Sequence, residues 1–404
     1  ILPCAKMFIK VILVTLCCGV LAENDYRCNQ LSALLLLKRP AYEFSVRLLQ
    51  RVSENTDAHF VYSPLSTWLQ LTALAEGATG RTFREIWRVT KHHRNRCFRK
   101  KLSDIMITMN TDLKEENKRR SIIAIDKLMA VKKPFINYVE NLYGIKVLLL
   151  DFTEPMTAAS EVNYAIEEGT KGAIDRIVYY DDFLFTVLLL SDANSFHSAW
   201  KTQFNKQYTT KQPFYSSQGL QIGDVSMMNH IGNFHVSEFP HLGATVLELP
   251  FANHRISMLL FLQSNKNWVG EIFYRLQKTR LASIFNSYKY EGVKLVNVTM
   301  PRFEIQTEVD NLPELVYDMG IKRIFNPDLA ELKEISNFKM FASLMSQVTK
   351  IKVNEEGITA ETEFLADSTT SVNFVLNKPF SFMVIDKLTD FILYAGIYSV
   401  PSQI

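Results

Sequence analysis

The segment whose residue types point most directly to chemistry is Asn354 to Phe380, NEEGITAETEFLADSTTSVNFVLNKPF, which holds no Arg or Lys between Lys352 and Lys378. Its residues alternate. One parity is apolar or small: Ile358, Ala360, Thr362, Phe364 and Ala366. The other parity holds every charge: Thr359, Glu361, Glu363, Leu365 and Asp367. A period of two with one apolar face predicts a half-buried strand, yet Glu355 to Ser371 has the polarity of a surface loop. The segment is therefore compatible with two backbone conformations, a half-buried strand and a surface loop.

The sequence lacks the common motifs of catalytic residues. The sequence contains no Gly-x-Ser-x-Gly elbow, His-Glu-x-x-His zinc helix, phosphate-binding glycine loop or paired Cys-x-x-Cys. His92-His93 alone is more typical of a surface pair than of a metal site. We therefore predict that the protein is not an enzyme and uses no metal or cofactor.

Length and composition favour one compact domain. The 404 residues are 47% hydrophobic and 22% charged, and no linker rich in Pro, Gly or Ser divides them. We expect residues 1–22 to be an export signal, with residues 1–6 a translation artefact before Met7, and residues 23–404 to be a single domain. The alternative is a buried N-terminal helix. The apolar run Phe8 to Leu21 is shorter than the roughly 20 residues that span a bilayer.

Removal of the signal would take away Lys6 and Lys10 and lower the formal net charge from +3 to +1. We therefore expect a secreted monomer with no membrane span and no nucleic-acid partner. Cys28 and Cys97 would remain after cleavage, either as one disulfide or as two thiols, and their spacing does not decide between these. Asn297-Val298-Thr299 is the only glycosylation sequon, and it lies in a strand-like run.

The elements that must position the segment are helices first and strands later. Leu31 to Val52 has helical spacing, with a helix start predicted at Pro40, and Ser63-Pro64-Leu65-Ser66 opens a helix over Thr67 to Glu76 with Ser63 as its cap. From Phe183 to Leu190 the chain reads as a fully buried strand. Later apolar runs cover Thr245–Leu249, Ser257–Leu262, Leu295–Ile305, Val348–Val353, Phe382–Ile385 and Ile392–Val400, with a helix near Leu312–Met319. This order predicts an α+β fold with large antiparallel or mixed sheets.

Motifs in this order resemble the serpin family from about residue 31 to residue 401. They are FVYSPLS (60–66), EGATGRT (76–82), VNYAIEEGTKGAI (162–174), FHSAWKTQF (196–204), GATVLELPF, ISMLLFL, MPRFEI (300–305), NEEG (354–357), NKPFSFMVID and LYAGIYSVP. The resemblance implies a helix-rich N-terminal half, three β-sheets and an exposed reactive-centre loop at about residues 355–376. It also implies a suicide-substrate inhibitor of serine proteases, whose cleaved loop inserts into the main sheet as a new strand.

The resemblance assigns roles to residues near the loop. The hinge would be Glu355, Glu356, Gly357, Ile358, Thr359 and Ala360. Counting from the hinge places the scissile bond at Ser371-Val372, within a window of Asp367 to Ser371. Because the loop has no Arg or Lys, we expect a target protease with a small specificity pocket, such as an elastase, and not a trypsin-like enzyme.

Several positions depart from the family pattern. Ile358 stands where threonine is usual, Glu361, Thr362 and Glu363 replace small residues, and the loop is a few residues short. Beneath the sheet the resemblance assigns Ser63, Ser66, Asp192 in place of asparagine, Gln347 in place of histidine, and a matching Trp200. These departures keep a second hypothesis open: a non-inhibitory serpin that acts as a carrier or another extracellular binding protein.

A basic segment, KHHRNRCFRKK (91–101), suggests a second site. In some family members this region binds sulfated polysaccharide, and here Arg94, Arg96, Arg99, Lys100 and Lys101 would do so, extended by Lys118, Arg119 and Arg120. The alternative is a solvated basic turn.

Overall fold

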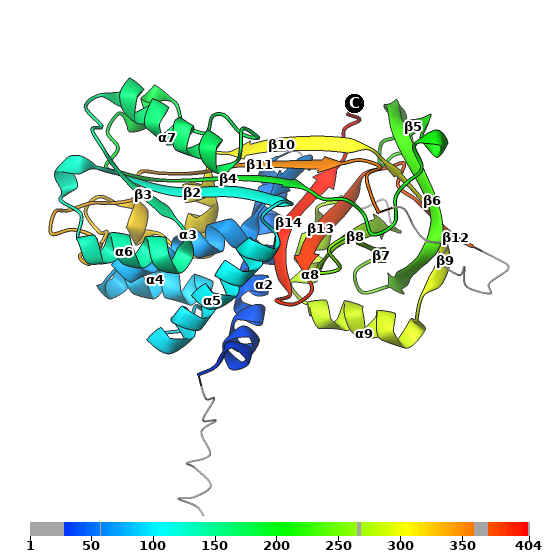
Figure 1. Ribbon diagram of the computed structural model, residues 1–404, viewed down its shortest axis with the longest axis horizontal. Coiled ribbons are helices and arrows are strands. Elements are labelled where there is room, and N and C mark those ends of the chain that lie inside the picture. The colour runs from blue at the N-terminus through cyan, green and yellow to red at the C-terminus, as the bar shows by residue number, and fades with distance from the viewer. Residues whose placement is uncertain (1–27, 57, 265–267, 359–370, 403–404) are drawn as a thin grey trace, which may run out of the picture.

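The computed structural model describes residues 28–56, 58–264, 268–358 and 371–402. Two sheets organise these residues (Figure 1). The main sheet has the order β10 (Phe303–Val309), β11 (Leu344–Val353), β4 (Leu188–His197), β2 (Asn117–Asp126) and β3 (Lys146–Leu150). The second sheet has the order β1 (Phe60–Tyr62), β14 (Phe391–Tyr398), β13 (Phe380–Asp386), β8 (Ile256–Gln263), β7 (Ala244–Pro250), β6 (Gln221–Phe239), β9 (Lys294–Pro301) and β12 (Val372–Val375), with β5 (Thr210–Tyr215) also paired to β6.

Helices cover both faces of the main sheet. Figure 1 shows α7 (Pro155–Gly169) on one face, with α3 (Pro64–Gly77), α4 (Gly80–Thr90), α5 (Arg96–Asp112) and α6 (Lys133–Tyr143) on the other. The other α-helices among the described residues are α2 (Gln30–Asn55), α8 (Glu271–Leu276), α9 (Leu281–Glu291) and α10 (Leu312–Met319). This is the predicted α+β architecture. In the described part of the chain, no helix combines the length and hydropathy needed to cross a bilayer.

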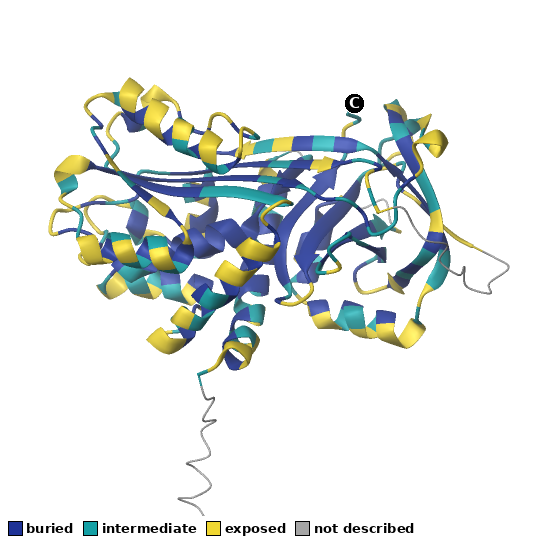
Figure 2. Cartoon of the chain, viewed as in Figure 1, coloured by how far each residue is buried: buried dark blue, intermediate teal, exposed yellow. Residues whose placement is uncertain are grey.

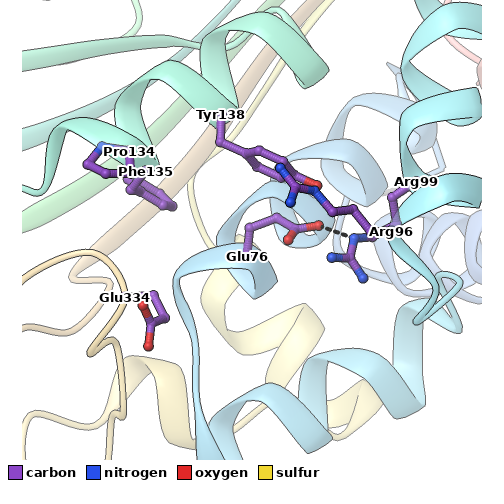
Figure 3. Close-up of a pocket in the computed structure, with 7 residues that line it drawn as sticks. All are labelled: Glu76, Arg96, Arg99, Pro134, Phe135, Tyr138 and Glu334. Atoms are coloured by element: carbon purple, nitrogen blue, oxygen red, sulfur yellow. Dashed lines mark ion pairs between the residues drawn. The ribbon is translucent and has the colours of Figure 1, made fainter.

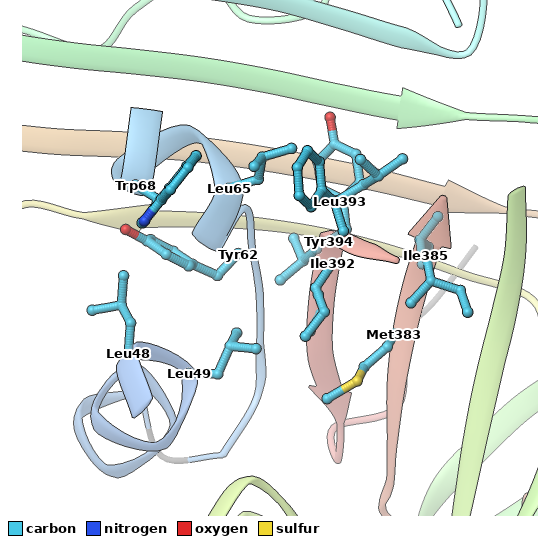
Figure 4. Close-up of a cluster of buried hydrophobic side chains, with 14 of the residues drawn as sticks. Leu48, Leu49, Tyr62, Leu65, Trp68, Met383, Ile385, Ile392, Leu393 and Tyr394 are labelled. Carbon is cyan, nitrogen blue, oxygen red and sulfur yellow. The ribbon is translucent and has the colours of Figure 1, made fainter. Parts of the chain in front are cut away.

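Side-chain alternation along the main sheet explains why both faces are apolar. On β4, Leu189 and Ala193 pack toward α7, whereas Leu188, Leu190 and Phe196 join the larger core on the opposite face. That core continues between the two sheets, and Figure 2 shows burial concentrated there. Figure 4 shows side chains from α2, α3, β13 and β14 meeting in it, including Leu48, Trp68, Met383 and Tyr394.

Three local expectations were wrong. The first helix does not start at Pro40. It begins at Gln30, where Asn29 Oδ1 accepts from Ser32 N at 2.9 Å, and it continues through Pro40 because apolar residues on both sides are buried. Ser63 precedes α3 but its side chain caps no amide. The strand expected from Phe183 begins only at Leu188, since Tyr180–Phe183 form a 3-10 turn and Phe185 is 98% exposed.

Candidate functional site

The main sheet is closed at the position where an inserted strand would have to enter. β11 and β4 are parallel neighbours, with continuous register from Leu344 opposite Leu189 to Lys352 opposite His197. Both ends of the loop segment lie in regular structure, because β11 precedes it and β12 follows it. The structure therefore holds the intact arrangement, with β4 and β11 in direct contact.

The hinge extends β11 along the segment that follows β4. Trp200 N donates to Glu356 O at 2.8 Å, Ile358 N donates to Trp200 O at 3.0 Å, and Phe204 N donates to Glu355 O at 3.2 Å. Gly357 pairs with Trp200 as a parallel bridge. The description stops at Ile358, which is 53% exposed, so Thr359 and Ala360 lie outside the described residues.

Gly357 is required by a close approach of two backbones. A Cβ placed on it would lie 2.6 Å from Gln203 Cα and 2.7 Å from Gln203 N. Because both contacts are to backbone atoms, no side-chain rotation could relieve them. A glycine in the hinge is therefore a packing requirement here.

The two hinge carboxylates have different environments. Glu355 is only 2% exposed, and its Oε1 accepts from Thr209 Oγ1 at 2.9 Å and lies 3.7 Å from Arg302 Nη1. Glu356 is at the surface, where its Oε2 lies 2.9 Å from His197 Nε2, and this hydrogen bond lowers the pKa of Glu356. Glu355 therefore fixes the start of the hinge, whereas Glu356 ties it to the end of β4.

Trp200 lies beneath the hinge. Its ring stacks on Phe251 with centroids 4.5 Å apart and planes 9° apart, and its Nε1 donates to Asn354 O at 2.8 Å. The indole is 2% exposed. It therefore supports the point at which β11 becomes the hinge.

Ser63, Ser66, Asp192 and Gln347 meet in one buried polar network at the first turn of α3. On the β11 side, Ser63 N donates to Gln347 Oε1 at 2.8 Å, and Gln347 Nε2 donates to Ser63 O at 3.1 Å. On the β4 side, Ser63 Oγ donates to Ser66 Oγ at 3.1 Å, and Ser66 Oγ donates to Asn194 Oδ1 at 2.9 Å. Parting β4 from β11 therefore requires breaking bonds to α3 on at least one side.

Two partners of Asp192 were missed by sequence reasoning. Asp192 has no exposed surface, its Oδ1 accepts from Asn194 Nδ2 at 2.5 Å, and its Oδ2 lies 3.2 Å from Arg119 Nη2 on β2. A buried carboxylate needs such donors. Arg119, which was predicted to extend a surface basic cluster, instead has a side chain only 12% exposed.

The far end of the loop returns to the second sheet. Ser371 is exposed, and Val372 is the first residue of β12, in parallel register with Val296 of β9. The predicted bond Ser371-Val372 therefore borders a strand. Residues 359–370, including most of the window from Asp367 to Ser371, lie outside the described residues.

The basic segment does not form one free cluster. Arg94 stacks on Trp87, with Cζ 3.8 Å from the ring centroid, and Lys101 Nζ lies 2.9 Å from Asp104 Oδ2. Arg99 is partly buried, with Nε 2.7 Å from Glu76 Oε1. Figure 3 shows Arg96 and Arg99 beside Tyr138 at one end of a cavity of about 460 Å³. Arg96 and Lys100 stay exposed.

His92 was expected at the surface, and that was wrong. It is 2% exposed, its Nδ1 lies 2.7 Å from Thr90 Oγ1, and its ring packs edge-on against Phe83. Burial, together with the charges of Arg99 and Arg94, lowers the pKa of His92 to about 4. The imidazole is therefore neutral in the folded protein near neutral pH.

Cys28 and Cys97 form a disulfide that joins the position two residues before α2 to the first turn of α5. Asn297 lies inside β9, where its Nδ2 donates to Asn373 Oδ1 at 3.1 Å and its Oδ1 accepts from Asn229 Nδ2 at 2.8 Å. A glycan on Asn297 would have to replace the contact to Asn373. Use of this sequon stays a prediction.

The chain is similar to known proteins in both sequence and structure. A family model described as Serpin (serine protease inhibitor) matches residues 40–401. Serine protease inhibitor 88Ea of Drosophila melanogaster is 26% identical, with 96% of this chain and 95% of that protein covered. Leukocyte elastase inhibitor of Xenopus tropicalis is 25% identical, with 89% and 97% covered. Native protease nexin-1, solved with heparin, superposes with a TM-score of 0.82 at 22% identity, over 92% of this chain and 100% of that one.

Proposed function

The chain belongs to the serpin family, and we propose that it is a secreted inhibitor of serine endopeptidases that acts as a suicide substrate. A target protease attacks a peptide bond between Ile358 and Val372. Its serine forms an ester with the new carboxyl end as that peptide bond breaks and the new amino end is released, and the freed segment from Ile358 onward inserts between β4 and β11. The acylated enzyme is then carried away from its productive geometry. The Cys28–Cys97 disulfide fits a protein made for an oxidising compartment.

The observation that carries this proposal is the closed pair β4–β11 with the hinge already hydrogen-bonded beyond its end. A strand that folds back after β11 and enters there would pair with both β11 and β4. Two antiparallel ladders would then replace the one parallel ladder. Each ladder hydrogen bond contributes about 1 kcal/mol net, so an insertion as long as β11 would stabilise the protein by an amount on the order of 10 kcal/mol. The intact loop therefore stores a driving force that cleavage can release.

The alternation of the loop residues supports insertion. With Ile358, Ala360, Phe364 and Ala366 directed to the core, the carboxylates of Glu361, Glu363 and Asp367 stay on the other face. Burying an unpaired carboxylate costs several kcal/mol, and this register avoids that cost. The loop sequence is thus compatible with insertion between β4 and β11.

The target is a protease with a small specificity pocket. The loop offers Ser, Thr, Ala and Leu but no Arg or Lys, and a trypsin-like pocket needs a basic side chain to pair with its buried acid. Polysaccharide binding by Arg94, Arg96, Arg99, Lys100 and Lys101 also remains a prediction. Its strongest support is a fold neighbour solved with heparin, and its weakest point is that Arg99 and Lys101 already pair with acids here.

The experiment is a titration of the secreted protein against elastase and trypsin, followed by denaturing electrophoresis. We expect a covalent complex with elastase that survives SDS and none with trypsin. A stable complex with trypsin would overturn the specificity, and quantitative loop cleavage by elastase without any complex would overturn inhibition.

A non-inhibitory serpin that carries a ligand is the second candidate. Ile358 at the first inserting position favours it, because a larger side chain must enter a closed sheet before the acyl-enzyme hydrolyses. The melting temperature of elastase-nicked protein separates the two candidates. A rise over the intact protein means that the loop inserts, and no change favours the carrier.

A further inference from the structure

The connection from α7 to β4 carries a group of exposed apolar and aromatic side chains, which we call the connection patch. Its members are Tyr179, Tyr180, Leu184 and Phe185, each at least 49% exposed. Phe185 is 98% exposed. Exposed apolar residues that stand singly are ordinary on a soluble protein, whereas a group of them marks a surface for contact with another molecule. The connection patch is therefore a candidate docking surface.

The backbone under the patch is held in place from beneath. Ile177, Val178 and Phe183 are buried, and they pack with side chains of β4 and β11 in the core under α7. Asn163 of α7 adds hydrogen bonds, because its Oδ1 accepts from Ile177 N at 2.9 Å and its Nδ2 donates to Val178 O at 2.8 Å. The exposed side chains are therefore presented on a fixed backbone, which lowers the conformational cost of binding.

Four acids adjoin the patch, and the protein does not neutralise them. Within the described part of the chain, no ion pair is formed by Asp181, Asp182, Glu308 or Asp310. Burial and the charges of Asp181 and Asp310 raise the pKa of Asp182. Burial and the charges of Asp310 and Asp182 raise the pKa of Glu308, which Arg176 offsets in part. The surface beside the patch is therefore negative.

A bound metal ion is one alternative use for these carboxylates. Among the residues that the structure describes, no group of three or more His, Cys, Asp or Glu side chains could hold a metal ion. A solvated acidic turn is the other alternative. It accounts for the charges but not for Phe185, which has a φ of 64°, where glycine or a short polar residue would be usual. An anionic membrane surface would be repelled by the four acids.

We propose that the connection patch binds a segment of another protein that carries arginine beside a large apolar side chain. Arginine fits this surface because the edge of a guanidinium hydrogen-bonds carboxylates while its face stacks on an aromatic ring. One such stack exists within the protein, where Arg176 Cζ lies 5.4 Å from the ring centroid of Tyr179. The apolar side chain of the partner would cover Phe185. This site does not depend on inhibitory function.

The test measures binding of two synthetic peptides of equal length to the intact full-length protein, by the anisotropy of a fluorescent label on each peptide. One peptide alternates arginine with leucine, and the other has glutamate in place of every arginine. We expect saturable binding of the arginine peptide, which weakens as salt is raised because exposed charges are screened. We expect no binding of the glutamate peptide.

Two matched comparisons locate the binding, and every residue that they replace is exposed. Phe185→Ser should weaken binding of the arginine peptide by at least about tenfold, the effect of losing one large apolar contact. Phe338→Ser, which removes another exposed phenylalanine, should leave it within about twofold. Asp181→Asn combined with Asp310→Asn should weaken binding by about fivefold, since exposed ion pairs contribute modestly. Asp328→Asn should leave it within about twofold.

Three results would each overturn the proposal: no saturable binding of the arginine peptide, equal binding of the two peptides, or equal binding by the wild-type and Phe185→Ser proteins. A fourth concerns the purified protein alone. Concentration-dependent dimerisation that Phe185→Ser abolishes would assign the connection patch to a second copy of the chain, and it would overturn the proposal as well.

Discussion

Arg119 Nη2 lies 3.2 Å from Asp192 Oδ2, so a guanidinium on β2 neutralises a fully buried carboxylate on β4. This pair stands at the end of the polar network that links β4, α3 and β11. The buried carboxylate of Asp192 is thereby paired with a cation from the neighbouring strand.

Removing Arg119 alone should therefore be costly. We expect Arg119→Gln to lower the free energy of unfolding by about 3–5 kcal/mol, because it leaves an unpaired buried charge. Asp192→Asn should cost less, since Asn194 can still donate to the amide oxygen. The double variant should match Asp192→Asn, and urea unfolding of the three proteins measures this. A single Arg119→Gln that unfolds like the wild type would contradict the pairing.

The hinge glycine gives a second prediction. Gly357→Ala should lower the free energy of unfolding of the intact protein by about 1–3 kcal/mol, because the new methyl overlaps the backbone of Gln203. Ile358→Ala, one residue on and exposed, is the matched control and should stay within about 0.5 kcal/mol of wild type. Denaturant midpoints at unchanged slope provide the measurement, and equal midpoints for the two variants would refute the close approach.

Much of the fold followed from the sequence, for physical reasons that differ by element. Leu312–Met319 and the strands at 244–250 and 256–263 carry strong periodicity, and the structure places them as expected. The predicted helix start at Pro40 was wrong because burial of side chains along α2 outweighs the loss of one backbone hydrogen bond. The strand start predicted at Phe183 was wrong because apolar content alone does not distinguish a strand from a turn with an exposed phenylalanine.

The site was predicted in part. The resemblance assigned Ser63, Ser66, Trp200 and Gln347 to positions beneath the sheet, and the structure brings Ser63, Ser66 and Gln347 into one network. Arg119 and Asn194 could not be assigned from spacing, since their roles depend on which face of β2 and β4 meets the core. Asp192, assigned by the resemblance to a position beneath the sheet, was the sequence signal that a nearby cation would be required.

Stability should depend on pH through His92. Its pKa is lowered to about 4 in the folded state from 6.5 in the unfolded chain, so between these values the unfolded chain binds the proton that the folded protein excludes. Through His92, the free energy of unfolding should therefore fall by about 1 kcal/mol from about pH 7.5 to about pH 5.5. Denaturant unfolding at both pH values measures the slope. A His92→Gln variant with an unreduced slope would assign the effect elsewhere.

The disulfide between Cys28 and Cys97 closes a loop with a sequence separation of 69 residues. Loop-closure entropy then predicts that replacing both cysteines by serine lowers the free energy of unfolding by about 4 kcal/mol. The control is the wild-type protein unfolded with reductant present, which should lose a similar amount. Equal stability with and without reductant would mean that the bond does not form in the purified protein.

Loop insertion is tested most directly by the melting temperature of the protein after elastase has nicked it between Ile358 and Val372. We expect a rise of about 13 °C over the intact protein, because an added strand worth on the order of 10 kcal/mol acts against an unfolding entropy of about 0.8 kcal/mol/K for a chain of this length. Ile358→Arg is the matched control. Its exposed side chain leaves the intact melting temperature unchanged, but insertion would bury the guanidinium, so nicking should give little or no rise. Nicked wild-type protein that melts with the intact protein would contradict the account.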